Sequence, residues 1–197
     1  TGNGTATVVA SGTTTNLNTA FNGMSYLGTQ HFNGSDTLTV TLNDGGNTGA
    51  GAVGTAMQSV GITVSPVNDA PSITNPGAQS ANENTNFPFS GADGNEITLI
   101  DVDAIESAGE LDLALSVSNG KLTLADTSGL TTVTNNGTAS ITMLGSVIAI
   151  NNALDGLIYR GNQDFNGTDT MNITVDDNGA TGSGGIKTAN TSITITV

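Results

Sequence analysis

The sequence repeats itself at a shift of 133 residues, and this repeat constrains the fold more than any other feature. Residues 3–64 align without a gap onto residues 136–197, and about 28 of the 62 paired positions are identical. The chain therefore contains one whole unit, residues 65–197, preceded by the C-terminal half of another, residues 1–64. We expect either a piece of a longer repetitive protein or a half unit that another chain completes.

Within each copy, apolar residues mostly alternate with polar ones, which predicts β-strands with one buried face. Clear examples are TLTVTL, LDLALSV and TSITITV. Asn-Gly pairs separate several of these segments, and tight turns with positive φ favour this dipeptide. The segment SVSNGKLTL in particular predicts a hairpin that turns at Asn119-Gly120.

One stretch departs from this alternation and predicts a short crossover helix. Val147, Ile150, Leu154 and Leu157 recur at steps of three and four residues, which is the period of a helix. Thr14, Leu17, Phe21 and Met24 hold the same places in the first copy. We therefore expect an all-β fold, an antiparallel β-sandwich with one short helix per unit.

The charge balance restricts the possible partners. The chain has 17 acidic and three basic residues, and its formal net charge at pH 7 is -14. Nucleic acids and anionic membranes bind clustered Lys and Arg, so neither is an expected partner, whereas a cation is. There is no Cys and a single His, and no well-placed pair of carboxylates stands out. We expect no enzyme activity and, without an apolar run of about 20 residues, no membrane insertion.

Oxygen-bearing side chains gather at strand ends and in the linker SPVNDAPSI, residues 65–73. The prolines of this linker stiffen it and mark the boundary between the units. Calcium takes six to eight oxygen ligands, and antiparallel strands would bring several candidates to one pole of the second unit. The main candidates are Asn68, Asp69, Asp101, Asp103 and Asp177, with Asp36 of the first unit facing the same linker from the opposite pole. The weaker candidates are Glu83, Asp164, Asp169 and Asp44. The alternative interpretation is that these are solvated turn residues.

The segments SPVNDAPSI, LIDVDA and VDDNGATGSGG resemble cadherin-type repeats in that order. The whole unit is most similar to the bacterial cadherin-like repeats of giant secreted adhesins, in which V-N-D-A-P linkers recur. This resemblance implies a cadherin/Ig-like sandwich and calcium bound between units by Asn68, Asp69, Asp101, Asp103 and Asp177. It also implies that Glu83 serves the next junction downstream.

The leading hypothesis is therefore a calcium-stiffened structural repeat of an extracellular bacterial surface or biofilm-matrix protein. Its expected partners are neighbouring repeats or subunits of the same type. One alternative is a self-assembling extracellular fibre, in which a neighbouring chain completes the half unit. Another is a calcium-dependent module that binds surface polysaccharide.

Overall fold

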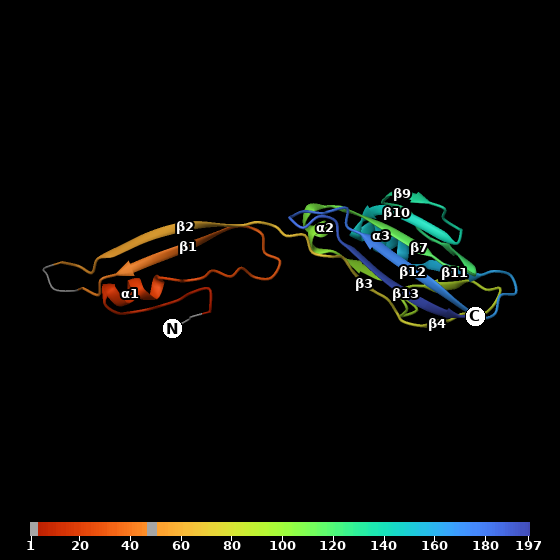
Figure 1. The fold of residues 1–197 in the computed structure, drawn as a ribbon, viewed down its shortest axis with the longest axis horizontal. Coiled ribbons are helices and arrows are strands. Elements are labelled where there is room, and N and C mark those ends of the chain that lie inside the picture. Colours follow the sequence, from red (N-terminus) through yellow and green to blue (C-terminus); the bar gives the residue numbers. More distant parts are fainter. Residues whose placement is uncertain (1–3, 47–50) are drawn as a thin grey trace. The chain divides into compact units, whose positions relative to one another are not determined.

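A computed structural model of the chain describes residues 4–46 and 51–197. It is built mostly of β-strands with few helices, which confirms the all-β class (Figure 1). The chain divides into two compact units, Thr1–Phe32 and Asn33–Val197. The predicted boundary between residues 64 and 65 stays a prediction.

The described residues of the unit Thr1–Phe32 form one helix, α1 (Thr14–Phe21). Its N-terminus is capped by the Thr13 hydroxyl, which accepts a hydrogen bond from the Asn16 backbone N–H at 3.3 Å. A Ser or Thr at this position satisfies one of the N–H groups that a helix start leaves without a partner.

The unit Asn33–Val197 begins with a hairpin of two long strands, β1 (Gly34–Asn43) and β2 (Thr55–Val64). The strands are antiparallel, and their register runs from the pair Gly34–Val64 to the pair Asn43–Thr55. Thr and Val dominate both strands, because branching at Cβ suits a pleated surface.

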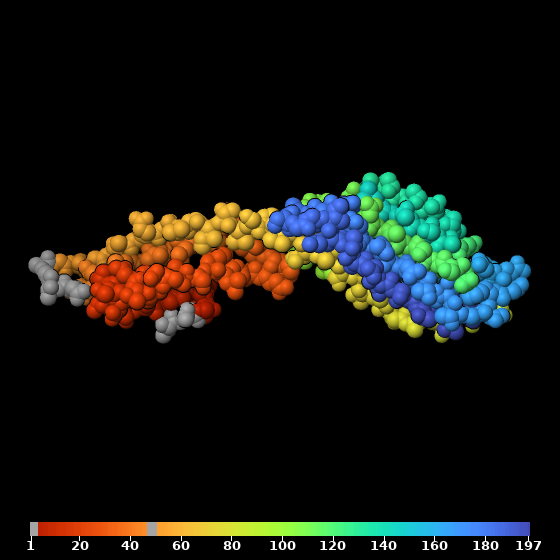
Figure 2. All heavy atoms as spheres, viewed as in Figure 1, coloured from red at the N-terminus to blue at the C-terminus, as the bar shows by residue number. Residues whose placement is uncertain are grey.

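The rest of this unit forms a six-stranded sheet in the order β4-β13-β12-β7-β10-β9, a three-stranded sheet in the order β5-β11-β8, and the pair β3-β6. Figure 1 shows β7, β10, β12 and β13 running side by side, and in Figure 2 β13 lies at the visible surface. The strands are β3 (Ser72–Thr74), β4 (Gln79–Ser80), β5 (Phe87–Phe89), β6 (Thr98–Ile100), β7 (Glu110–Ser116), β8 (Gly120–Thr123), β9 (Leu130–Thr134), β10 (Ser140–Ser146), β11 (Leu157–Gly161), β12 (Thr168–Asp176) and β13 (Thr188–Thr196).

The two larger sheets share one hydrophobic core. On β7 the residues Leu111, Leu113 and Leu115 are buried and the residues between them are more exposed, as the period of two requires. They join Phe89 of the three-stranded sheet and Ile150 of a helix in one cluster. Burying this cluster is the main favourable contribution to the stability of residues 65–197.

The predicted crossover helices are confirmed. Helix α3 (Val147–Leu154) packs its apolar side on the core, and α1 occupies the matching 133-residue offset in the first copy. Leu157, which we expected to continue the pattern, instead begins β11. The expectation of one helix per unit is wrong for residues 65–197, because α2 (Val102–Ser107) forms where the Asp101 side chain caps the Ala104 N–H.

The predicted hairpin at Asn119-Gly120 is also wrong, because β7 and β8 belong to different sheets. The chain crosses between the sheets here, and the buried carboxylate of Asp169 accepts hydrogen bonds from the backbone N–H groups of Ser118 and Asn119, both at 3.0 Å. Gly120 is required for close packing, since a Cβ on it would lie 2.6 Å from a ring carbon of Tyr159.

Candidate metal site at the linker

The linker is held against the loop that follows β12. Val67 forms a parallel bridge with Ser183, the Asn68 N–H donates to the Ser183 carbonyl at 2.9 Å, and the Ser183 N–H donates to the Pro66 carbonyl at 3.1 Å. Gly182 permits this approach, since it has a φ of +122° and a Cβ on it would lie 2.7 Å from the Asn68 nitrogen. The linker is therefore part of the packed body of residues 65–197.

Four buried polar side chains gather where this linker meets α2 and the loop after β12. We call Asn68, Asp101, Asp103 and Asp177 the linker cluster; each is at most 4% exposed. Asn68 donates its amide to Asp177 Oδ2 at 2.6 Å, and the Asp69 N–H donates to Asp103 Oδ2 at 2.6 Å. Four of the five main candidates from the sequence are thus brought together as buried side chains, while the Asp69 side chain is exposed and contributes its backbone.

Asp101 carries the least satisfied carboxylate of the linker cluster. Its Oδ1 accepts a hydrogen bond from the Ala104 N–H at 2.8 Å, but its buried Oδ2 has no hydrogen-bond partner. Burial, reinforced by the negative charges of Asp177 and Asp103, raises the pKa of Asp101 above its usual value. Three carboxylates that share a buried site repel one another unless a positive charge lies among them.

Asp177 is oriented by its own loop. Its Oδ1 accepts hydrogen bonds from the Gly179 and Lys187 backbone N–H groups, both at 2.8 Å, which leaves Oδ2 to face Asn68. Asp44, one repeat earlier, accepts the same two bonds from Gly46 and Gly54, both at 2.9 Å. These two bonds hold the pKa of the exposed Asp44 below its usual range. Both loops therefore hold one aspartate in the same way, and only Asp177 has the linker beside it among the described residues.

The donor set of the linker cluster fits a hard cation. Asn68 Oδ1 is the second buried oxygen with no hydrogen-bond partner, and Asn68 Nδ2 is already engaged by Asp177 and by the Gly185 carbonyl at 2.8 Å. Two orphaned acceptors beside three carboxylates need a donor or a cation, and oxygen ligands of this kind suit calcium. In the described part of the chain, no three Asp, Glu, His or Cys side chains are arranged as a metal centre by themselves. Calcium would therefore need the Asn68 amide and backbone carbonyls as further ligands.

Asp36 lies near the linker end of the β1–β2 hairpin. It is exposed, stands opposite Ile62 in the strand register, and accepts a hydrogen bond from the Thr37 N–H at 2.7 Å. Asn33, three residues earlier, donates its side-chain amide to Glu106 of α2 at 2.8 Å. The role of Asp36 in a shared junction stays a prediction.

The weaker candidates at the far end of residues 65–197 lie in different environments. Asp164 is exposed and exchanges two hydrogen bonds with Asn84, the neighbour of the exposed Glu83. Asp169 is buried and accepts four hydrogen bonds from this chain, from Ser118, Asn119, Tyr159 and Thr170. Such a carboxylate is fully satisfied by the protein itself.

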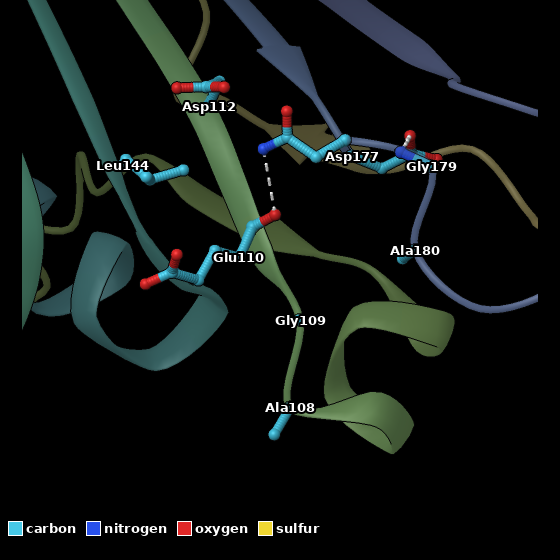
Figure 3. Close-up of a pocket in the computed structure, with 9 residues that line it drawn as sticks. Ala108, Gly109, Glu110, Asp112, Leu144, Asp177, Gly179 and Ala180 are labelled. Atoms are coloured by element: carbon cyan, nitrogen blue, oxygen red, sulfur yellow. Dashed lines mark hydrogen bonds between the residues drawn. The ribbon is translucent and has the colours of Figure 1, made fainter.

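An acidic hollow beside the linker cluster was not predicted from the sequence (Figure 3). Glu110 and Asp112 project from β7, and Asp112 stands directly opposite Asp176 of β12. Like charges in such a cross-strand pair destabilise a sheet. The signal was available in the polar face of ELDLALS, but strand pairing is needed to bring the charges together. The lining residues are Ala108, Gly109, Glu110, Asp112, Leu144, Asp177, Asn178, Gly179 and Ala180.

No helix within the described residues is long and apolar enough to cross a membrane.

A family profile described as "Protein GAMETE EXPRESSED 2 domain" matches residues 100–183, less than half of the chain. These residues include α2, Asp101, Asp103 and Asp177.

Comparison with curated proteins gives no match. One similar solved structure is described as "Complete structure of manganese lipoxygenase of Gaeumannomyces graminis and partial structure of zonadhesin of Komagataella pastoris". Its TM-score is 0.33 at 10% identity, and the match covers 80% of this chain and 54% of that one. The chain thus spans about half the length of that structure.

Proposed function

We propose that residues 65–197 are a cadherin-like β-sandwich repeat that calcium stiffens at the linker, in an extracellular adhesive or matrix protein. The observation that carries this proposal is the pair of buried oxygens without partners, Asp101 Oδ2 and Asn68 Oδ1, beside the carboxylates of Asp103 and Asp177. A divalent cation relieves the repulsion between the carboxylates and satisfies both oxygens. The extracellular bacterial setting rests on the resemblance of the linker motifs.

Each member of the linker cluster has a defined part in this proposal. Asp101 and Asp103 offer carboxylate oxygens from the start of α2, and Asp177 offers Oδ2 from the loop after β12. Asn68 offers its amide oxygen from the linker itself. A bound calcium ion supplies the positive charge that ties the linker to these two elements. The polysaccharide-binding alternative stays a prediction.

Thermal unfolding of the full chain, in calcium and in chelator, tests the proposal. A ligand that binds only the folded state at a hundredfold excess over its Kd adds about 2.7 kcal/mol to the free energy of unfolding. We expect calcium to raise the Tm of the transition of residues 65–197 by several degrees. Identical melting curves with calcium and with chelator contradict the proposal.

The variant Asp101→Asn is expected to change the Tm differently in chelator and in calcium, which substitution of a purely structural aspartate would not do. The amide oxygen keeps the bond from the Ala104 N–H, while the buried charge is lost. In chelator we expect this variant to melt at or above the wild-type Tm, because an unpaired buried charge is costly. In calcium we expect most of the metal-induced rise in Tm to be lost. Glu96→Gln, which removes an exposed charge, is the matched control and should keep the full calcium response.

A further inference from the structure

Two of the three Lys and Arg residues of the chain stand directly opposite each other on one sheet. Lys121 of β8 pairs with Arg160 of β11 in the antiparallel register of the three-stranded sheet, and both residues are exposed. We call them the cationic pair. Their neighbours Leu122 and Tyr159 are fully buried, so the cationic pair lies on the solvent face of this sheet. Within the described residues, no carboxylate forms an ion pair with Lys121 or Arg160.

The surface beside the cationic pair is uncharged. The next row on the same face of the sheet consists of Thr123, Ile158 and Pro88, which stand opposite one another on β8, β11 and β5. Like charges in a cross-strand pair destabilise a sheet. An anionic group from outside this sheet would relieve the repulsion, and the neutral row leaves room for a partner to approach.

The six-stranded sheet, on the other side of the shared core, carries a pair of the opposite sign. Asp112 of β7 stands directly opposite Asp176 of β12, beside Glu110 at the acidic hollow (Figure 3). We call Asp112 and Asp176 the acidic pair; Asp112 is exposed and Asp176 is partly exposed. The next row on this face, Ala114 and Thr174, is again uncharged.

The cationic pair and the acidic pair match in spacing and are opposite in charge. Side chains that stand directly opposite in an antiparallel sheet have Cβ atoms about 5 Å apart, and this holds for both sheets. Two such pairs laid face to face form two ion pairs at once, and the repulsion within each sheet is relieved. Because the two pairs lie on opposite sides of one core, a single molecule cannot bring them together.

We propose that the cationic pair of one molecule docks on the acidic pair of a second copy of this chain. The contact joins two different surfaces, so it is heterologous and extends into a lateral row instead of closing as a dimer. It goes beyond the proposed function, because it needs no ion at the linker cluster. A carboxylated polysaccharide would satisfy the cationic pair alone and would leave the acidic pair uncompensated.

The net charge of -14 makes this contact weak and dependent on ionic strength. At about 0.1 M salt the Debye length is about 10 Å, so the overall repulsion between two molecules is largely screened while charges in contact still attract. At about 1 M salt the Debye length falls to about 3 Å, and the attraction between the two pairs weakens as well. We therefore expect association at the lower of these ionic strengths and less at the higher.

Charge reversal on each surface tests the proposal in the full chain. One variant carries Lys121→Glu with Arg160→Glu, and the other carries Asp112→Lys with Asp176→Lys. By sedimentation velocity at about 0.1 M salt, the mean mass of the wild type should keep rising with concentration, without a plateau at the dimer. Each variant alone should associate at least about tenfold more weakly than the wild type, because like charges then face each other.

An equimolar mixture of the two variants is the matched control. Each reversed surface then meets its complement on the other variant, so the mixture should associate like the wild type. The two reversals change the net charge by equal and opposite amounts, so the mixture also keeps the mean net charge of the wild type. Rescue in the mixture requires that both variants are folded. The milder variant Lys121→Gln with Arg160→Gln, which removes the repulsion within the sheet, should also weaken association.

Several results would overturn the proposal. The first is a wild type that stays monomeric, and the second is association of the variants as strong as that of the wild type. A third is a mixture that fails to associate although both variants are folded by circular dichroism. Association that requires calcium also overturns it, because an ion that bridges two acidic surfaces would then replace the ion pairs. A monomeric wild type that binds polygalacturonate, while Lys121→Gln with Arg160→Gln does not, assigns the cationic pair to an anionic polysaccharide instead.

Discussion

At the scale of single residues, the hydrogen-bond donors around a buried aspartate determine what it does. Asp169 accepts four bonds from the chain, so it fixes the crossing from β7 to β8. Asp101 accepts one and leaves a buried oxygen without a partner. The sequence identified Asp101 as a main and Asp169 as a weaker candidate ligand, but it could not show how many donors surround each, because the Ser118 and Asn119 donors to Asp169 lie 51 and 50 residues away. Only the structure shows that Asn68 Oδ1 and Asp101 Oδ2 are buried without a hydrogen-bond partner.

The Tyr159–Asp169 contact predicts a stability change at alkaline pH. Burial and the adjacent Asp169 carboxylate raise the pKa of Tyr159 well above its usual value, which is about 10. The folded protein therefore keeps this proton after the unfolded chain has lost it. The raised pKa of Tyr159 therefore stabilises the folded protein fully below about pH 10. Above that pH the free energy of unfolding falls by up to about 1.4 kcal/mol per pH unit.

We expect Tyr159→Phe to lower the free energy of unfolding by about 1 kcal/mol at neutral pH, because Asp169 loses one donor. Above about pH 10 the variant should lose stability less steeply than the wild type. Urea unfolding between pH 8 and pH 11 measures both effects, and Tyr26→Phe, at the exposed counterpart position, is the control. Parallel pH profiles for wild type and Tyr159→Phe would show that the hydroxyl is not held as the structure has it.

At the scale of elements, the periodicity of apolar residues located the helices correctly. The contacts that direct the chain from one sheet to the other could not be predicted from the sequence. The three- and four-residue steps located α3, and the repeat then located α1. The crossing at Asn119-Gly120 has the sequence of a hairpin turn, yet the Asp169 carboxylate and the close approach of Tyr159 to Gly120 direct the chain into the other sheet. Helix α2 is short and depends on the Asp101 cap, so it has no periodic signal of its own.

The matched helices give a paired test of burial. Ile150 of α3 is fully buried, while its counterpart Leu17 of α1 is half-buried on a helix with no buried residue. We expect Ile150→Ala to lower the free energy of unfolding of residues 65–197 by about 3 kcal/mol, from lost transfer energy and a residual cavity. Leu17→Ala should leave that transition unchanged. Denaturant unfolding measures both variants. Equal decreases in the free energy of unfolding would mean that the two helices pack equivalently.

At the scale of the whole molecule, the proposed function assigns the linker the control of how much one repeat can move against the next. Two prolines restrict residues 65–71, and backbone hydrogen bonds of Pro66 and Asn68 with Ser183 hold the linker to the loop after β12. The acidic chain, with a net charge of -14, favours separation of neighbouring units when no cation lies between them. The resemblance to cadherin-like repeats predicted this junction. The buried linker cluster supplies the carboxylates that a restraining cation would bind.

Distance distributions between two spin labels test this restraint, and the absence of Cys makes the labelling specific. Gln58→Cys on β2 and Thr132→Cys on β9 are exposed positions on the two sides of the linker. We expect calcium to narrow the distribution, because an ion shared by the linker and α2 removes rotations that the prolines leave free. Adding Asp103→Ala should keep it broad in calcium, while both proteins remain folded by circular dichroism. A distribution of the same width in calcium, in chelator and with Asp103→Ala would contradict the restraint at the linker. A bound ion would then stabilise residues 65–197 without restricting the angle between the units.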